Sequence, residues 1–231
     1  MYRLTMTRPH NLSFALTAII FALFLTSNNP STSLRVSALN SSDSNNDVKT
    51  DKNWPLFVLG FIAAFLHSAL SWLPLVAVTL TWLVLKIRQE PAKFSRIIYL
   101  ALGIIGGLLA RPNPLGGLKL AYIQVVQIMI VKMNNIPLTF GRELKTPDFS
   151  SIIKNLLPVI LIIIATLILY KVAIKKIQGA ESNNQKNIFW ASLAISLVFL
   201  FITVFVARRS YDIFAGFSLI TASSALTIYL S

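Results

Sequence analysis

Cysteine is absent from this 231-residue chain. Its absence excludes disulfide bonds, thiolate metal sites and cysteine nucleophiles. Acidic residues are also scarce, because 8 Asp and Glu stand against 21 Lys and Arg, and charged residues make up only 13% of the chain. A soluble domain of this size carries about 25% charged residues. The deficit argues against a soluble fold and leaves few carboxylates for acid–base chemistry.

Sequence motifs of well-known enzyme classes are missing as well. The chain contains no HExxH zinc motif, no Walker phosphate loop and no GxSxG nucleophile turn. It has no cluster with metal-ligand spacing and no pair of carboxylates on one helical face. We therefore assign no catalytic residue and expect no metal and no cofactor.

Apolar residues, in contrast, are abundant. They make up 55% of the chain, and the mean hydropathy is +0.69. The longest uncharged run, 54–85, has 32 residues, and runs near 20 residues match a hydrocarbon layer of about 30 Å. The sequence predicts an all-α, polytopic helical membrane protein with five or six transmembrane helices, and we expect it in the plasma membrane.

The net charge of +13 could indicate a nucleic-acid partner, but its distribution does not. Most Lys and Arg residues flank the apolar runs, as in KIRQEPAKFSR and YKVAIKK. Flanking cations are typical of membrane topology and of attraction to anionic headgroups. The predicted partner is therefore the lipid bilayer, with no nucleic acid.

Three regions differ in composition. Residues 1–27 have a basic start and a short apolar centre, which fits either a cleaved signal peptide or an uncleaved signal-anchor helix. Residues 28–53 are rich in Ser, Asn and Asp and form a predicted disordered linker. Residues 54–231 form the predicted multi-spanning domain.

The run 54–85 leaves two alternatives open. It would be about 48 Å long as one helix, too long for an untilted span, and Pro74 interrupts it. It is either one long kinked span or a tight pair of shorter helices with a break near 71–74. If it crosses once, the positions of Lys and Arg favour 28–53 and 132–154 on the same, outer side.

A short break with the sequence ARPNPLGG separates two apolar runs. Arg111 and Asn113 each precede a proline, which ends a helix, and Gly116 and Gly117 permit a sharp turn. With Lys119 nearby, the pattern predicts a rigid elbow at headgroup depth that holds a phosphate or an anionic lipid headgroup. The simpler interpretation is an ordinary interhelical loop.

Three polar residues stand out inside apolar surroundings. His67 lies within the run 54–85, where an ionisable group is a functional hypothesis by default, although a hydrogen bond to a neighbouring serine would also satisfy it. Gln124 and Gln127 share one face of a predicted helix over 118–131. We treat these three residues as a candidate intramembrane polar site.

The patterns FIAAFLHSALSWLPL and LGIIGGLLARPNPLGGLKLAY resemble, over about residues 55–125, the polytopic glycosyltransferases of the C superfamily. The resemblance implies a partial enzyme that handles a lipid-linked sugar phosphate, with a polyprenyl-phosphate lipid near Arg111. The catalytic acid of that family has its only counterparts here in linker residues Asp43, Asp47 and Asp51. The alternative is a non-enzymatic subunit of a transporter or assembly complex, with a partner membrane protein.

Overall fold

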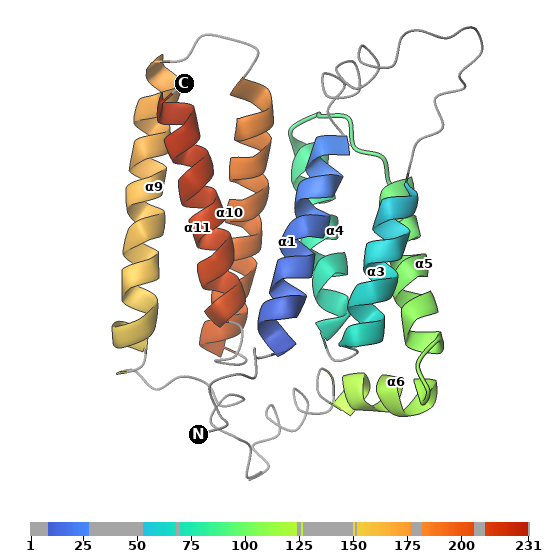
Figure 1. Cartoon of the computed structure of the whole chain (residues 1–231). Coiled ribbons are helices and arrows are strands. Elements are labelled where there is room, and N and C mark those ends of the chain that lie inside the picture. Colours follow the sequence, from blue (N-terminus) through green and yellow to red (C-terminus); the bar gives the residue numbers. More distant parts are fainter. Residues whose placement is uncertain are drawn as a thin grey trace, which may run out of the picture. The chain divides into compact units, whose positions relative to one another are not determined.

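The computed structural model consists of helices (Figure 1). The residues that it describes are 9–27, 53–67, 70–123, 126, 150, 152–176, 182–205 and 211–230. Within these residues there is no strand, which confirms the all-α prediction for this part of the chain. Most of the predicted linker, most of 132–154, and both glutamines Gln124 and Gln127 lie outside the described residues.

The chain divides into two compact units. Unit 1 comprises residues 1–82 and 89–135, and unit 2 comprises 83–88 and 136–231. The helices of unit 1 are α1 (Pro9–Ser27), α3 (Trp54–Leu66), α4 (Trp72–Ile87, whose last turn belongs to unit 2), α5 (Ser95–Leu109) and α6 (Pro114–Tyr122). The helices of unit 2 are α9 (Leu157–Lys176), which follows a π-helical turn at Ile152–Leu156, α10 (Ser182–Phe205) and α11 (Tyr211–Leu230).

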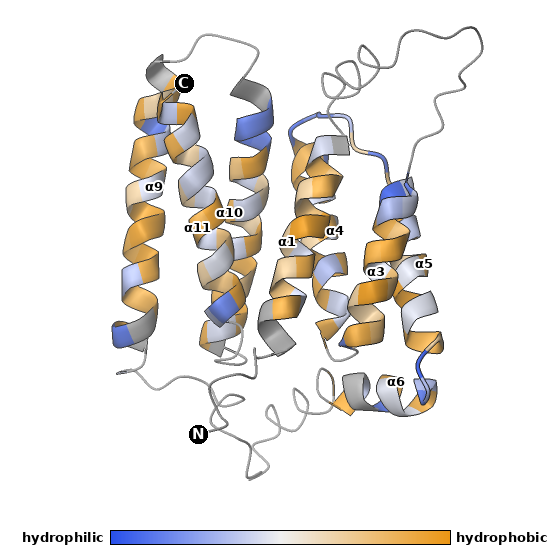
Figure 2. Ribbon diagram, viewed as in Figure 1, coloured by the Kyte–Doolittle hydropathy of each residue, from blue (hydrophilic) through white to orange (hydrophobic). Residues whose placement is uncertain are grey.

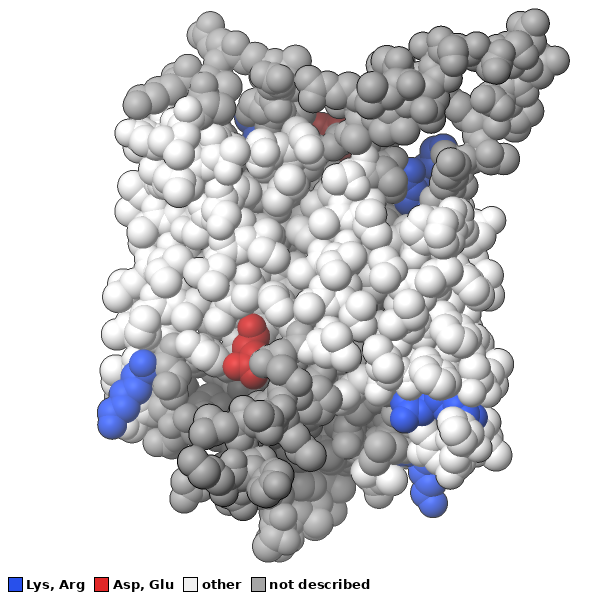
Figure 3. All heavy atoms as spheres, viewed as in Figure 1, with Lys and Arg blue, Asp and Glu red and all other residues white. Residues whose placement is uncertain are grey.

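Three helices of the described chain are long and apolar enough to cross a membrane, fewer than the five or six predicted. These segments are Leu157–Ile174, Asn184–Val204 and Tyr211–Leu230. Four further apolar helical segments are shorter, with 10–17 residues: Leu12–Thr26, Trp54–Leu66, Trp72–Ile87 and Ser95–Leu109. Apolar residues dominate these helices, and hydrophilic residues concentrate toward helix ends (Figure 2). On the visible face of each unit, the charged side chains leave an uncharged central band (Figure 3).

The run 54–85 forms two helices and not one long span. Helix α3 ends at Leu66 and α4 begins at Trp72, and the chain reverses direction between them (Figure 1). The break lies a few residues before the predicted position. The reason is that Pro74 occupies the first turn of α4, where a missing N–H costs no intrahelical hydrogen bond.

This reversal changes the expected sidedness of the loops. With a single span over 54–85, two passes separate residues 28–53 from 132–154, one over 54–85 and one in the following helix. Because α4 runs in the direction opposite to α3, crossings by both helices would cancel, and only a crossing by α5 would change sides. The arrangement now predicts that the two segments lie on opposite sides of the membrane.

Helices α3 and α5 pack at very short distance. Gly103 faces the Phe57 carbonyl and Gly107 faces the Phe61 carbonyl, so closely that a Cβ at either glycine would overlap backbone. Gly60 of α3 is also tightly packed, since a Cβ there would lie 2.7 Å from the Leu100 oxygen. Small residues that let backbones touch are typical of helix pairs in membranes.

Unit 2 is held together partly by buried hydroxyl groups. Helix α11 packs against both α10 and α9. Between α10 and α11 the Thr221 hydroxyl lies 3.0 Å from the Ser192 hydroxyl, and Ser192 in turn donates to the Ile188 carbonyl at 2.7 Å. Such hydroxyls fit an apolar interior because backbone carbonyls of their own helix satisfy them.

Candidate functional site: the elbow after α5

The elbow is a three-residue bend at 111–113 followed at once by α6. Asn113 begins α6 in the manner of an N-cap, because its Oδ1 accepts a hydrogen bond from the Gly116 N–H at 2.9 Å. Its carbonyl accepts from the Gly117 N–H at 3.0 Å. Pro114 takes the first helical position, where its fixed φ suits the helix. The local sequence therefore starts a helix here.

This start corrects the expected role of the two glycines. Gly116 and Gly117 were predicted to form the turn, but both lie inside α6. Gly116 instead leaves space for the cap, since a Cβ there would lie 2.5 Å from the Asn113 side-chain nitrogen. Neither glycine has a positive φ, so neither is needed for a left-handed conformation.

Arg111 reaches back to the end of α3. Its Nη1 donates a hydrogen bond to the Ala64 carbonyl at 3.3 Å. Ala64 belongs to the last turn of α3, where carbonyls lack intrahelical donors and the helix dipole is negative. Arg111 is half-buried and serves first as a cationic cap that fastens the elbow to α3.

Helix α6 lies across the end of α5 (Figure 1). Three of its apolar residues are exposed on one face: Leu115, Leu118 and Tyr122. Leu115 is 78% exposed, which is unusual for leucine unless lipid or a partner covers it. Lys119, also exposed, lies at the edge of this face. A short helix with an apolar face and a flanking cation suits the plane of the membrane interface.

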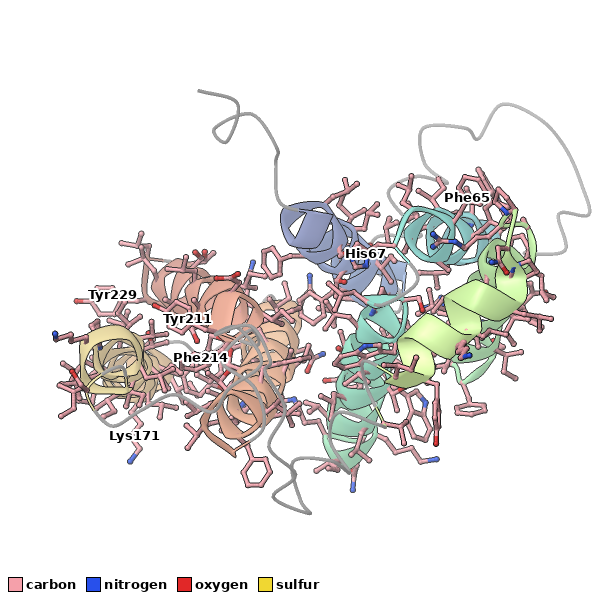
Figure 4. All side chains as sticks on the ribbon, turned by 90° about the horizontal axis from the view of Figure 1, so that it is seen from below. Phe65, His67, Lys171, Tyr211, Phe214 and Tyr229 are labelled. Carbon is pink, nitrogen blue, oxygen red and sulfur yellow. The ribbon has the colours of Figure 1, made fainter. Side chains whose placement is uncertain are left out.

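His67 is not in the middle of a helix but at the C-cap of α3. Its backbone N–H donates to the Ala63 carbonyl at 3.0 Å, and its Nδ1 accepts from the Leu70 N–H at 3.3 Å. Its side chain lies toward α1 and α4, whereas Phe65 points to the outer side (Figure 4). An Nδ1 that accepts a backbone proton places the ring hydrogen on Nε2. His67 thus acts in the turn between two helices, and the predicted site with Gln124 and Gln127 extends outside the described residues.

Carboxylates are nearly absent from the described chain. Only Glu90 and Asp212 occur there, and they belong to different units. No group of three His, Cys, Asp or Glu residues within the described ranges could hold a metal ion. At the elbow, Arg111 and Lys119 therefore have no described acidic residue beside them, and the local field is positive.

A second cluster of polar and aromatic residues was not singled out by the sequence analysis. It lies in unit 2, where Arg88 Nε donates to Asn187 Oδ1 at 2.9 Å and Trp190 Nε1 donates to the Tyr170 hydroxyl at 2.9 Å. Trp and Tyr near the ends of apolar runs are typical of the membrane interface. That signal could have marked Tyr170 and Trp190, but no spacing rule pairs Arg88 with a residue 99 positions away.

Comparisons with known proteins found no relative. A scan against protein-family models gave no match, and searches of curated proteins and of solved structures also gave none.

Proposed function

We propose that this protein is a multi-pass integral membrane protein that serves as a helical subunit of a membrane complex. The observation that carries this proposal is the outward-facing apolar surface of its helices. On α9, for example, Leu161, Ile164 and Ile168 are exposed at helical spacing. In a membrane, lipid or partner helices would cover this row of apolar side chains, whereas in water the row would stay exposed to solvent.

The proposal includes five or six membrane passes. Three helices of unit 2 have the length, and two or three of the four shorter apolar helices of unit 1 would supply the remainder. Helix α3, with 13 residues, is about 20 Å long, so it would need local thinning of the bilayer or flanking residues that extend toward the headgroups. A pair formed by α3 and α4 that dips into the membrane without crossing would give the lower count.

We further propose that the elbow holds the phosphate of an anionic lipid headgroup, including a polyprenyl-phosphate lipid. Arg111 uses one of its donors on Ala64, and a guanidinium has five. Lys119 adds a second cation on an exposed helix that lies in the expected headgroup layer. Asn113 supports the site by fixing the start of α6.

The experiment compares three substitutions for co-purified anionic lipid and for insertion into the membrane. Lys119→Gln removes charge without touching α3 and should reduce bound anionic lipid while the fold stays intact. Arg111→Gln should reduce both bound lipid and stability, whereas Arg111→Lys should keep part of the cap but lose the planar fork that matches phosphate. If Lys119→Gln and Arg111→Gln leave the bound lipid unchanged, the elbow is an ordinary loop.

The subunit role has its own test. Cross-linking in native membranes should capture the full chain with a stoichiometric membrane partner. A chain that is recovered alone, in every condition that preserves its helices, would contradict the subunit role. The glycosyltransferase resemblance stays a prediction, because the linker carboxylates that it would need lie outside the described residues.

A further inference from the structure

Arg88 and the side chains around it in unit 2 form a cluster of hydrogen-bond donors that shares no residue with the elbow. Asn187 fixes the guanidinium through its Nε, at 2.9 Å. Asn187 is only 5% exposed, so the partner that orients Arg88 is itself held by packing. A guanidinium anchored at Nε presents its two terminal nitrogens in a fixed plane.

The second half of the cluster is aromatic. The Tyr170 ring stacks on Phe189 with centroids 3.8 Å apart, and its hydroxyl accepts the Trp190 indole N–H. The oxygen thus has an internal donor, while its own proton meets no acceptor among the described residues. Asn187, the partner of Arg88, and Trp190, the partner of Tyr170, are three residues apart on α10 and therefore share one face of that helix. The cluster therefore offers guanidinium nitrogens and one hydroxyl proton close to the same positive charge.

No carboxylate in the described ranges neutralises that charge. Glu90 follows two residues later but forms no ion pair with a described residue. Asp212 lies at the start of α11. Because Thr221 of α11 meets Ser192 of α10 and these successive helices run in opposite directions, the start of α11 is at the end of unit 2 away from Asn187.

The depth of the cluster indicates which ligand would reach it. Asn187 lies in the second turn of α10, near the start of its apolar segment, and Trp190 is 38% exposed, whereas Tyr170 is 5% exposed. Trp and Tyr in this position belong to the headgroup layer. Lys171, exposed beside Tyr170 in sequence, reaches outward from α9 (Figure 4).

We propose that Arg88, oriented by Asn187, together with the Tyr170 hydroxyl, binds a phosphate group, that of an anionic phospholipid headgroup. This site is independent of the elbow and contains none of its residues. Phosphate oxygens match both the planar terminal nitrogens of arginine and a hydroxyl donor. Asn187 is a positioning residue, since it touches Arg88 and not the phosphate.

The test uses the purified full chain in neutral detergent and native mass spectrometry of bound phosphatidylglycerol, with phosphatidylcholine as reference lipid. Arg88→Gln should weaken phosphatidylglycerol binding about ten- to hundredfold, the effect of losing a charge-assisted hydrogen bond. Asn187→Asp keeps an acceptor for Nε but adds an internal anion that competes with phosphate, so it should also abolish the preference while the helices stay folded. Lys171→Gln, the matched loss of an exposed cation, should change binding less than about threefold.

Two results would overturn the proposal. Equal losses in Lys171→Gln and Arg88→Gln would mean that general charge attracts the lipid, and wild-type binding in Asn187→Asp would mean that the guanidinium is not used. Circular dichroism and tryptophan emission confirm folding of each variant, and Asn187→Asp decides the question if Arg88→Gln does not fold. Inorganic phosphate at millimolar concentration is the competitor: displacement of phosphatidylglycerol identifies free phosphate as a ligand too, and its failure identifies the lipid as the source.

Discussion

Replacing single glycines of α5 by alanine tests the tightest packing in unit 1. Gly103 and Gly107 face the backbone carbonyls of Phe57 and Phe61 on α3. Gly106, on the same helix, faces only ring atoms, the nearest being Phe61 Cδ2 at 3.6 Å from its would-be Cβ. The chain thus supplies a matched control in which the same substitution makes only ordinary van der Waals contacts.

The expected magnitude follows from the overlap with backbone. At Gly60 a Cβ would lie 2.7 Å from the Leu100 oxygen, whereas relaxed C–H···O contacts lie at about 3.3–3.6 Å. The helices would need to separate by roughly half an ångström or more, which forfeits about a quarter to a half of their dispersion energy. Overlap is greater at Gly103 and Gly107, so each alanine there should cost about 1–3 kcal/mol of unfolding free energy. Alanine at Gly106 should be neutral or slightly stabilising, because it favours helix over glycine.

The assay is reversible unfolding of the full chain in mixed micelles with rising sodium dodecyl sulfate, followed by circular dichroism. Gly103→Ala and Gly107→Ala should shift the midpoint to lower detergent fraction, while Gly106→Ala should stay at or above wild type. Equal midpoints for Gly103→Ala and Gly106→Ala would refute the close approach of α3 and α5.

Three further outcomes are expected. Gln89 has a φ of 59°, in the left-handed region, so Gln89→Gly should raise the unfolding free energy by up to about 1 kcal/mol, and a loss of stability would contradict this conformation. Thr221→Val removes the hydroxyl that meets α10 and should cost about 0.6 kcal/mol. The exposed Thr227, which donates within its own helix, is the control, and its valine variant should unfold like wild type. Thiols introduced at Ser44 and Thr146 of this cysteine-free chain should label from opposite sides of intact cells, and labelling from the same side would restore a single crossing by 54–85.

Composition predicted the helical class because the apolar runs are long and several of them give the same indication. Each apolar run constrains many residues at once, and the bilayer thickness sets the relevant length. The position of the α3–α4 break was less accessible. Proline at position 74 indicates that the helix is interrupted nearby, but a proline in a first turn marks a start and not a break. The sequence alone does not distinguish a helix start from a helix break at Pro74, because that requires knowing where the preceding helix ends.

At the elbow, too, neighbouring residues determine one part of the structure and tertiary packing determines the other. Asn113 and Pro114 are local start signals for a helix, and the backbone follows them. The partner of Arg111 is a carbonyl 47 residues away, and it depends on α3 and α5 running side by side in the same direction. The Arg88–Asn187 pair depends in the same way on tertiary packing. Pairings between distant residues follow from helix packing, which hydropathy does not encode.

The short length of the unit 1 helices bears on the environment of Arg111 at the elbow. Helix α5 has 15 residues and is therefore about 22 Å long, several ångströms less than the hydrocarbon layer of about 30 Å. Under the proposed crossing by α5, residues at its end lie near the apolar boundary, where a bare cation is costly and a hydrogen-bond acceptor is valuable. Arg111 meets this need on one side through the Ala64 carbonyl. Its remaining donors require acceptors as well, and at this depth the phosphate oxygens of the headgroup layer are the nearest abundant source.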